Sequence, residues 1–289
     1  MTAAGSAQKV QLPWSRIIWF GLLIAGCYAP VLVALVKQWN DDPDMGHGFF
    51  VPLIVGFILW QRREELSLLK PAPDWRGLIL VIWGGLQLML ATLGAELFLA
   101  RTAIVITLTG VVWLLGGKLV LKKLAFPLFL LLLMIPIPAV IYNEITFPLQ
   151  RLASRLAEDA LSIISIPVLR EGNVLELPNQ RLSVVEACSG IRSLLSLTFL
   201  ALVYGYFFEK RPSIRIVLLV STVPIAIIAN ASRVTLTGIL TEVKPEIAEG
   251  FFHLLEGWVI FIVAFAILLL FHQVLIRVMR FAGAKRVSA

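Results

Sequence analysis

The chain has 289 residues, of which 59% are apolar and 15% are charged, and its mean hydropathy is +0.90. Several long uncharged runs carry this excess of apolar residues, which excludes an ordinary soluble enzyme. The formal net charge of +7 would suggest nucleic acid in a soluble protein, but the basic residues of membrane proteins gather in cytoplasmic loops. The composition therefore predicts an all-α polytopic membrane protein without a nucleic-acid partner.

Apolar runs predict about eight transmembrane helices, near residues 17–36, 49–60, 77–93, 102–115, 124–141, 191–208, 214–231 and 253–274. The N-terminus is polar and weakly basic, and the first run has full spanning length without a cleavage site, so we expect an uncleaved first helix. Pro52, near the start of the short second run, would let that run tilt or re-enter the membrane. We expect one integral-membrane domain over residues 1–289.

Residues 142–187 form the one long segment that is not expected to span. Apolar residues recur at steps of four and three over residues 145–163, with charged residues between them, which is typical of an amphipathic helix on the membrane surface. Further on, short β-type runs flank the turn-prone residues Pro178, Asn179 and Gln180. A small β-hairpin on the outer face and an irregular loop both fit this stretch.

The distribution of charge predicts the orientation of the spans. With eight spans, the segments on the side of the N-terminus hold most of the Lys and Arg residues but few of the acidic ones. The positive-inside rule therefore puts both termini in the cytoplasm. Cys188, Arg233 and His253 then all fall near the outer boundary, because each lies where an expected span begins or ends on that side.

A thiol lies at the start of the sixth expected span, within the sequence VVEACSGIRSLLSL. Cys188 stands there between an acidic residue, Glu186, and a basic one, Arg192. The exposed N–H groups and the dipole at the start of a helix favour an anion, so the position suits a thiolate. The alternative is that a lone cysteine serves as a small apolar residue. Cys27 lies inside an apolar run, so we expect no disulfide.

A thiolate at this position requires a cation. Lowering the pKa of a cysteine by about two requires about 2.7 kcal/mol, whereas a helix terminus supplies roughly 0.3–1 kcal/mol. Arg233 can stabilise the thiolate or a tetrahedral oxyanion, and His253 can transfer a proton in acyl transfer. The alternatives are an interfacial anchor for Arg233 and a solvated ring for His253. Arg192 competes with Arg233, because it lies one turn from Cys188 if Cys188 is helical.

These residues carry a resemblance to the exosortase family of bacterial membrane proteases. The motif EACSGIRSLLSL is followed by an Asn-bearing helix that ends in NASRV and by a His near the start of the last span. GHGFFVPLI after the first helix and REGNVLELP before the cysteine also resemble that family, so the similarity covers about residues 47–258. The EACSGIR match is specific, whereas the His-Gly and Arg matches alone would be weak. The resemblance implies that Cys188, Arg233 and His253 are the catalytic residues.

The resemblance also implies the activity and its setting. The family cleaves, and is thought to transfer, exported proteins that carry a C-terminal PEP-CTERM signal, which consists of a Pro-Glu-Pro motif, a spanning helix and a basic tail. The reaction would be that of a cysteine peptidase or transpeptidase acting through a thioester, on a fold unrelated to sortases. The resemblance further implies a location in the bacterial inner membrane, an active site on the periplasmic side, and a role in surface or exopolysaccharide matrix assembly. The expected partners are PEP-CTERM precursors and membrane lipid, with no metal, no cofactor and an unidentified acceptor.

Five further residues are candidates for supporting roles: Glu186, Arg192, His47, Asn230 and Glu256. His47 would contact substrate or serve as a structural turn element between two glycines. Glu256 follows His253 by about one helical turn and would hold the imidazole. Glu186 would orient a neighbour or be solvated, and Asn230 shares a helix face with Arg233. Cys27 and His272 are assigned to packing and boundary roles.

A transporter is the rival class, since a polysaccharide export or polymerisation component would also be polytopic. Arg233, Arg192 and Glu186 would then line a sugar or ion path. Transporters commonly place ionisable groups near the middle of the membrane, whereas Cys188, Arg233 and His253 all fall near one boundary and the expected helix interiors hold few charges. Glu96 and Arg101 bracket a short outer turn and do not favour the rival. A non-catalytic membrane scaffold is the third alternative, and it leaves the cysteine unexplained.

Overall fold

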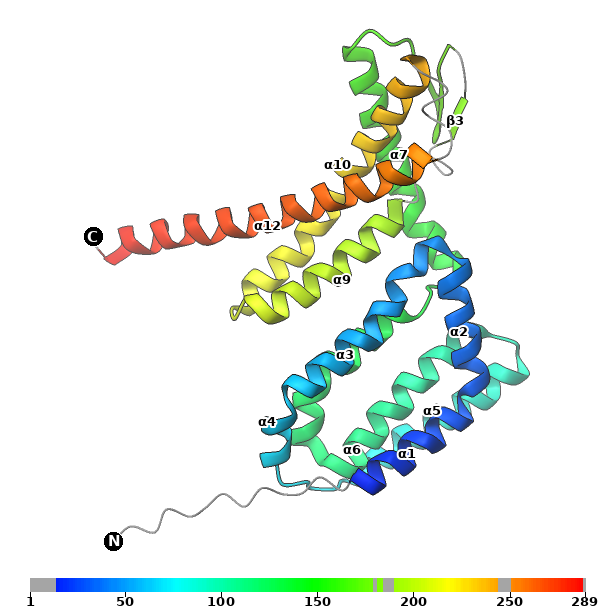
Figure 1. The fold of residues 1–289 in the computed structure, drawn as a ribbon, viewed down its shortest axis with the longest axis vertical. Helices are drawn as coiled ribbons and strands as arrows, with labels where there is room; N and C mark the ends of the chain where they lie inside the picture. Colours follow the sequence, from blue (N-terminus) through cyan, green and yellow to red (C-terminus); the bar gives the residue numbers. More distant parts are fainter. Residues whose placement is uncertain (1–13, 179–180, 184–189, 244–250, 288–289) are drawn as a thin grey trace. The chain divides into compact units, whose positions relative to one another are not determined.

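The computed structural model of the chain describes residues 14–178, 181–183, 190–243 and 251–287. The chain is mostly helical and forms two compact units, Met1–Pro138 and Ala139–Ala289, which are described in turn (Figure 1). The single integral-membrane domain expected from the sequence stays a prediction.

The described elements of the first unit are α1 (Trp14–Cys27), α2 (Ala29–Asp41), η1 (Pro43–Phe49), α3 (Phe50–Gln61), α4 (Arg63–Leu68), α5 (Arg76–Leu93), α6 (Leu97–Leu130) and η2 (Leu131–Met134). The helices α3 and α5 fall where apolar runs predicted them. A Cβ on Gly84 would collide with the side chain of Thr107, so this glycine lets α5 pack directly on α6.

The expectation of one continuous helix over residues 17–36 is wrong. The chain breaks at Tyr28, and α1 and α2 meet at an angle of 73°. Pro30 lies in the first turn of α2, where its missing N–H costs least. Tyr28 is buried, and its hydroxyl lies 2.7 Å from the hydroxyl oxygen of Thr107 on α6. Cys27, expected to pack inside a helix, is exposed beside this break.

The expected fourth and fifth spans join into α6, which is interrupted at Gly117. The φ of Gly117 is 80° and its ψ is −179°, a region that only glycine adopts without strain. A Cβ there would also collide with the carbonyl oxygen of Ala72. The backbone N–H groups of Ala72 and Asp74 donate to Gly116 and Leu114, at 3.3 and 3.2 Å. The connection before α5 therefore satisfies the carbonyl groups that the break exposes.

The described elements of the second unit are α7 (Ala139–Ile163), β1 (Leu169–Glu171), β2 (Val174–Glu176), β3 (Arg181–Ser183), α9 (Gly190–Phe208), α10 (Pro212–Val243) and α12 (Phe251–Val287). The amphipathic helix predicted over residues 145–163 is present within α7, although its position on a membrane stays a prediction. The apolar run that was expected to span to residue 141 ends earlier, because residues 135–138 separate η2 from α7.

A three-stranded antiparallel sheet follows α7, with the strand order β1-β2-β3. The short β-type runs predicted here do form strands, whereas an outer-face position for them stays a prediction. The sheet is fixed to α7 because the Ser154 hydroxyl donates to Gly172 at 3.1 Å and Arg170 pairs with Glu158 at 2.7 Å. Its buried side chains share a core with α7 and α10, formed by Ala157, Leu161, Leu175, Leu177, Leu182 and Val234.

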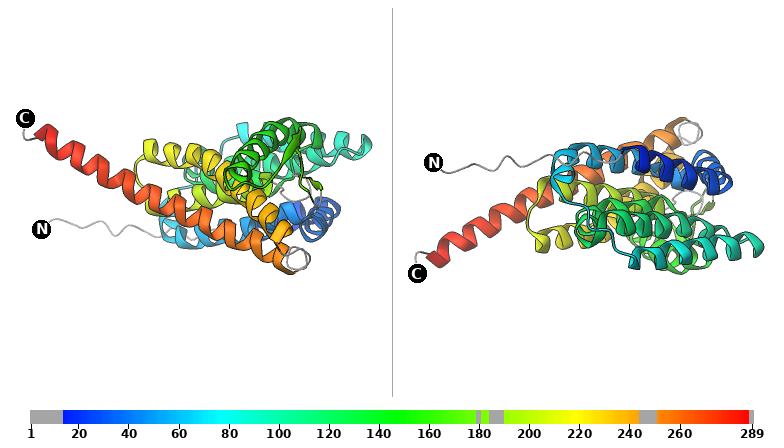
Figure 2. Two further views of the ribbon diagram at one scale, coloured as in Figure 1. Left: turned by 90° about the horizontal axis from the view of Figure 1, so that it is seen from above. Right: turned by 90° about the horizontal axis from the view of Figure 1, so that it is seen from below.

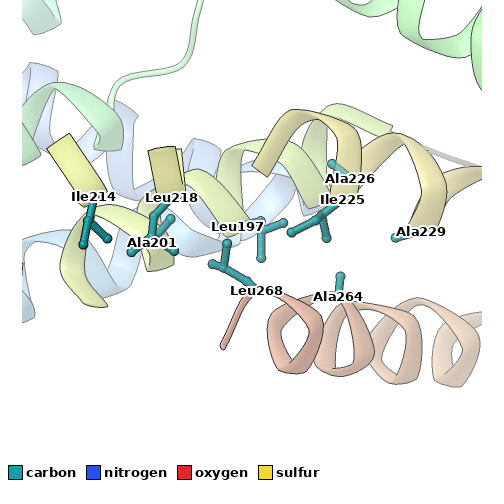
Figure 3. Close-up of a cluster of buried hydrophobic side chains, with 9 residues drawn as sticks. All are labelled: Leu197, Ala201, Ile214, Leu218, Ile225, Ala226, Ala229, Ala264 and Leu268. Carbon is teal, nitrogen blue, oxygen red and sulfur yellow. The ribbon is translucent and has the colours of Figure 1, made fainter. Parts of the chain in front are cut away.

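A second core joins α9, α10 and α12. Figure 3 shows its members, with Ala264 and Leu268 of α12 facing residues of the other two helices. These other members are Leu197, Ala201, Ile214, Leu218, Ile225, Ala226 and Ala229. The helices α9 and α10 are joined by a short turn, and α12 continues well beyond that turn in both views of Figure 2.

A buried polar network holds the three helices together at this turn. Glu209 and His272 are each about 5% exposed, and the Nε2 of His272 lies 3.2 Å from the Glu209 carboxylate. The Nδ1 of His272 lies 2.9 Å from the hydroxyl of Tyr204 on α9. Arg211 donates its backbone N–H and its Nε to Glu209, at 2.8 and 3.1 Å. From the sequence, His272 was assigned only to packing and a boundary position. In the structure it also contacts two polar side chains.

Four helices of the described residues are long and apolar enough to cross a membrane, or five if the bent α1–α2 pair is one span. These four are α5, α6 with η2, α10 and α12. The prediction of about eight spans is not confirmed. The helix α3 has 12 residues and is about 18 Å long, which is shorter than the roughly 30 Å hydrocarbon core.

The network predicts a pH dependence of stability. Hydrogen bonds from the side chain and backbone of Arg211 lower the pKa of Glu209 from 4.5 to about 2. A carboxyl group with a lowered folded-state pKa stabilises the fold above its unfolded pKa, and this contribution is lost as pH falls from about 4.5 towards 2. We therefore expect the difference in melting temperature between wild type and Glu209→Gln to be largest near neutral pH and to shrink below about pH 4.5.

The measurement is thermal unfolding of both proteins in an uncharged detergent across this pH range. Glu64→Gln, which changes an exposed carboxylate, serves as the matched control and should show no such trend. A difference between wild type and Glu209→Gln that stays constant with pH would contradict the role of the Glu209 carboxylate.

Candidate functional site

The helix hairpin α9–α10 sets the levels of the site residues along the bundle axis. The helix α9 has 19 residues, so Gly190 lies about 27 Å from the turn. An equal distance along α10, counted from Pro212, reaches Asn230, and Arg233 lies about one turn further. Arg233 and Asn230 are therefore at the end of the hairpin where α9 begins, directly after the segment that contains Cys188.

The sequence predicted that Arg233 emerges from the end of a span, near residue 231. In the structure, Arg233 lies inside α10 instead. The helix α10 continues from residue 231 to Val243, because this part packs on α7 and on the sheet. Val234 is fully buried in that core, and a Cβ on Gly238 would lie only 3.2 Å from Leu161 of α7. Arg233 is thus held within a packed helix rather than at a helix terminus.

The guanidinium group of Arg233 is partly enclosed. Its Nε is buried and has no hydrogen-bond partner among the residues that the structure describes. A buried donor without a partner costs about 1–3 kcal/mol, so a group that accepts a hydrogen bond here would be favoured. The backbone carbonyl of Arg233 accepts a hydrogen bond from the Thr237 hydroxyl, one turn later in α10, at 3.0 Å.

The chain on either side of the candidate nucleophile is anchored on this part of α10. Leu182 of β3 shares a buried core with Val234 of α10, the residue after Arg233. The helix α9 begins at Gly190, two residues after Cys188, at the level of Asn230. Cys188 and Glu186 themselves lie outside the described residues.

His253 belongs to the first turn of α12, and Glu256 lies one turn later in the same helix. Arg192 lies in the first turn of α9. The structure describes the backbone of these three residues but not their side chains. His272, which bonds to Glu209 at the α9–α10 turn, follows His253 by about 28 Å along α12. His253 therefore lies towards the opposite end of the three-helix core from that turn.

Asn230 is buried on α10, with 6% of its surface exposed, and lies one turn before Arg233 on the same helix face. Its burial agrees with the expected role within the helix bundle. Among the described residues, no group of three or more His, Cys, Asp and Glu side chains could hold a metal ion.

His47 belongs to the first unit and has a structural environment. It lies in η1 and is 9% exposed, and its Nε2 is 3.2 Å from the carbonyl oxygen of Leu133. Burial holds the pKa of His47 below its ordinary value of 6.5. The next backbone carbonyl is also bonded by a ring nitrogen, since the Nε1 of Trp39 donates to the Met134 carbonyl oxygen at 2.9 Å. Of the two roles considered from the sequence, these contacts favour the structural turn element.

Sequence reasoning missed a buried arginine in the first unit. Arg101 is 4% exposed in the second turn of α6, and its Nε has no hydrogen-bond partner in the part of the chain that the structure describes. Glu96, which was paired with it as the bracket of an outer turn, caps α6 by accepting the Leu99 N–H at 2.7 Å. The small residues Ala100 and Ala103 beside Arg101 were the available signal that this helix face packs closely.

The comparisons with known proteins are consistent with the motifs at this site. The chain matches the family model described as Transmembrane exosortase (Exosortase_EpsH) over residues 39–270. No curated protein and no solved structure matches it. The matched range includes α9 and α10, the first part of α12 and most of the first unit. Because the match covers most of the chain and several helices are long and apolar enough to span, this multi-pass membrane protein belongs to the transmembrane exosortase family.

Proposed function

We propose that the protein is a membrane cysteine peptidase or transpeptidase that cleaves the C-terminal PEP-CTERM signal of exported proteins. The observation that carries the proposal is the environment and position of the Arg233 side chain. Its buried Nε has no partner among the described residues, and it lies at the end of the α9–α10 hairpin where the Cys188 segment enters α9. Family membership supports the same reaction class.

Each catalytic residue has one role in the proposed reaction. The Cys188 thiolate attacks the carbonyl carbon of the scissile peptide bond and forms a tetrahedral intermediate. Arg233 stabilises the negative oxygen of this intermediate. The intermediate collapses to a thioester as the C–N bond breaks, and His253 protonates the departing amine. Water or an acceptor amine then attacks the thioester and releases the thiolate.

The electrostatic requirement supports a role for Arg233 beside the helix start. A thiolate at neutral pH needs about 2.7 kcal/mol to lower its pKa by about two, and a helix terminus supplies roughly 0.3–1 kcal/mol. An arginine remains charged at every accessible pH, and a partly enclosed site strengthens its interaction with an anion. Arg233 is held in a packed part of α10, so little reorganisation is needed.

The proposed substrate is the spanning helix of the signal, which would lie in the bilayer against α9, α10 and α12. Outward residues on these helices are apolar, including Val220 and Ile228 of α10 and Ile262 of α12. The scissile bond would lie on the periplasmic side of the inner membrane, with the basic tail and both termini of the enzyme in the cytoplasm. A role in exopolysaccharide matrix assembly belongs to this proposal.

Transport is the weaker alternative. Among the buried ionisable residues of the described chain, Arg101 lies in the second turn of α6, and Glu209 lies in the α9–α10 turn, where His272 contacts it. Arg233 lies about 30 Å along α10 from the turn, a distance comparable to the hydrocarbon thickness. These positions do not form the central ionisable site that a transporter commonly uses.

The direct test is cleavage of a precursor. Co-expression of the wild-type protein with a precursor bearing a PEP-CTERM tail should give a shortened product, measured by gel mobility and by mass. Cys188→Ala should leave the precursor intact, because no other thiol replaces the nucleophile. Cys27→Ala is the matched control and should process normally, since Cys27 is exposed and has no role in the proposed reaction. An intact tail with the wild-type protein, or normal cleavage by Cys188→Ala, would refute the proposal.

A pair of substitutions separates the two roles considered for Arg233. Arg233→Lys keeps the charge but loses the planar set of donors, so we expect it to reduce cleavage about 10²–10³-fold, nearly as much as Arg233→Ala. Cleavage rates would be compared at equal membrane abundance, with Arg192→Lys and Arg192→Ala as the parallel pair. Near-normal cleavage by Arg233→Lys would leave only an interfacial anchor. A loss confined to the Arg192 pair would transfer the electrostatic role to Arg192.

A further inference from the structure

A basic cavity in the first unit is not used by the proposed reaction. It has a volume of about 480 Å³ and lies where the connection before α5 crosses the break in α6. Trp75, Lys118 and Lys122 line it together with Asp74 and three apolar residues. Its size falls within the range of small-molecule sites, which is about 300–1,000 Å³.

The walls of the cavity are fixed by the backbone. Gly117 adopts a φ of 80°, which brings α6 against the carbonyl group of Ala72. The N–H groups of Ala72 and Asp74 donate to carbonyl groups on the α6 side, at 3.3 and 3.2 Å. The connection and the broken helix therefore form one structured surface rather than a loose loop beside a helix.

The charge of the cavity favours an anion. Lys118 and Lys122 are one helical turn apart on α6, so their ammonium groups share a face. Asp74 is the acidic residue of the lining, and its two oxygens accept from the Arg76 N–H at 3.0 Å and from the Trp113 Nε1 at 3.1 Å. Within the described residues, neither Lys118 nor Lys122 forms an ion pair. Both side chains are exposed and available to a ligand.

The cavity lies at the end of a candidate membrane span. The helix α5 begins at Arg76 and is one of the helices long and apolar enough to cross a membrane. Trp75 precedes it and is 71% exposed. Tryptophan concentrates at the level of lipid headgroups, because its ring is apolar and its N–H is polar. A headgroup position for Trp75 would therefore put the two lysines of the same cavity at the level of the lipid phosphate groups.

We propose that this cavity binds the headgroup of an anionic phospholipid. The phosphate lies between the ammonium groups of Lys118 and Lys122, and the Trp75 ring packs beside the glycerol and the first acyl carbons. Basic pockets between membrane helices recognise such headgroups through the same combination of fixed cations and an interfacial position. None of the lining residues is a proposed catalytic residue, so the inference does not depend on the proposed peptidase activity.

The test uses the full-length protein in an uncharged detergent, with lipid binding followed by native mass spectrometry and by thermal unfolding. The probes are phosphatidylglycerol, phosphatidylcholine and inorganic phosphate. Phosphatidylglycerol should bind the wild-type protein and raise its melting temperature, and the other two probes should do neither. Lys118→Gln combined with Lys122→Gln should weaken phosphatidylglycerol binding by about tenfold or more, because two cations near the phosphate are lost.

Lys37→Gln combined with Lys210→Gln is the matched control, because it removes the same charge from two exposed lysines outside the cavity. This control should bind phosphatidylglycerol as the wild type does. Equal weakening in both double variants would show a general attraction to anionic lipid and overturn the site. Stabilisation by inorganic phosphate equal to that by phosphatidylglycerol would show a free-anion site and overturn the lipid assignment. All substituted lysines are exposed, so each variant should melt like the wild type without lipid, which the same scans measure.

Discussion

The contact between Glu209 and His272 is the constraint on which the arrangement of α9, α10 and α12 depends. It joins the turn of the helix hairpin to α12 in a buried setting, where an unpaired carboxylate would be costly. Because the three helices are joined at this turn, their lengths determine which residues lie at the opposite end of the bundle. Arg233, the start of α9 and the first turn of α12 all lie about 27–32 Å from the turn.

The opposite end of the bundle is held by a different kind of contact. The sheet packs on α7 through Ser154 and Arg170, and its buried face meets α10 at Val234. In the chain, β3 precedes the Cys188 segment and α9 follows it. The polar network therefore holds α9, α10 and α12 together at the turn, and the apolar core holds the sheet against α7 and α10 at the other end. This division suits a site whose cation must be rigid before the substrate arrives.

Hydropathy and periodicity predicted the elements whose burial follows from local pattern, such as α5, the start of α9 and the amphipathic part of α7. They failed where a distant contact decides the backbone. The hydroxyl of Tyr28 reaches α6, and Gly117 adopts a conformation that matters only because Ala72 lies against it. The site showed the same limit, since residue types identified candidates but did not reveal the packed setting of Arg233. A small β-hairpin was one of two alternatives predicted for residues after α7, and the chain forms a three-stranded sheet there, whose apolar residues complete the α7–α10 core.

The central proposal is that the Cys188 thiolate reacts beside Arg233, which lies at the end of the α9–α10 hairpin where α9 begins. A short bifunctional thiol reagent tests it directly, applied to a Cys27→Ser protein that carries Arg233→Cys beside the native Cys188. Peptide mass spectrometry should find an intramolecular link between positions 188 and 233. The same protein with Ser213→Cys in place of Arg233→Cys should give none, because Ser213 lies at the start of α10, beside the turn. A link from Cys188 to position 213, or none to position 233, would contradict the account.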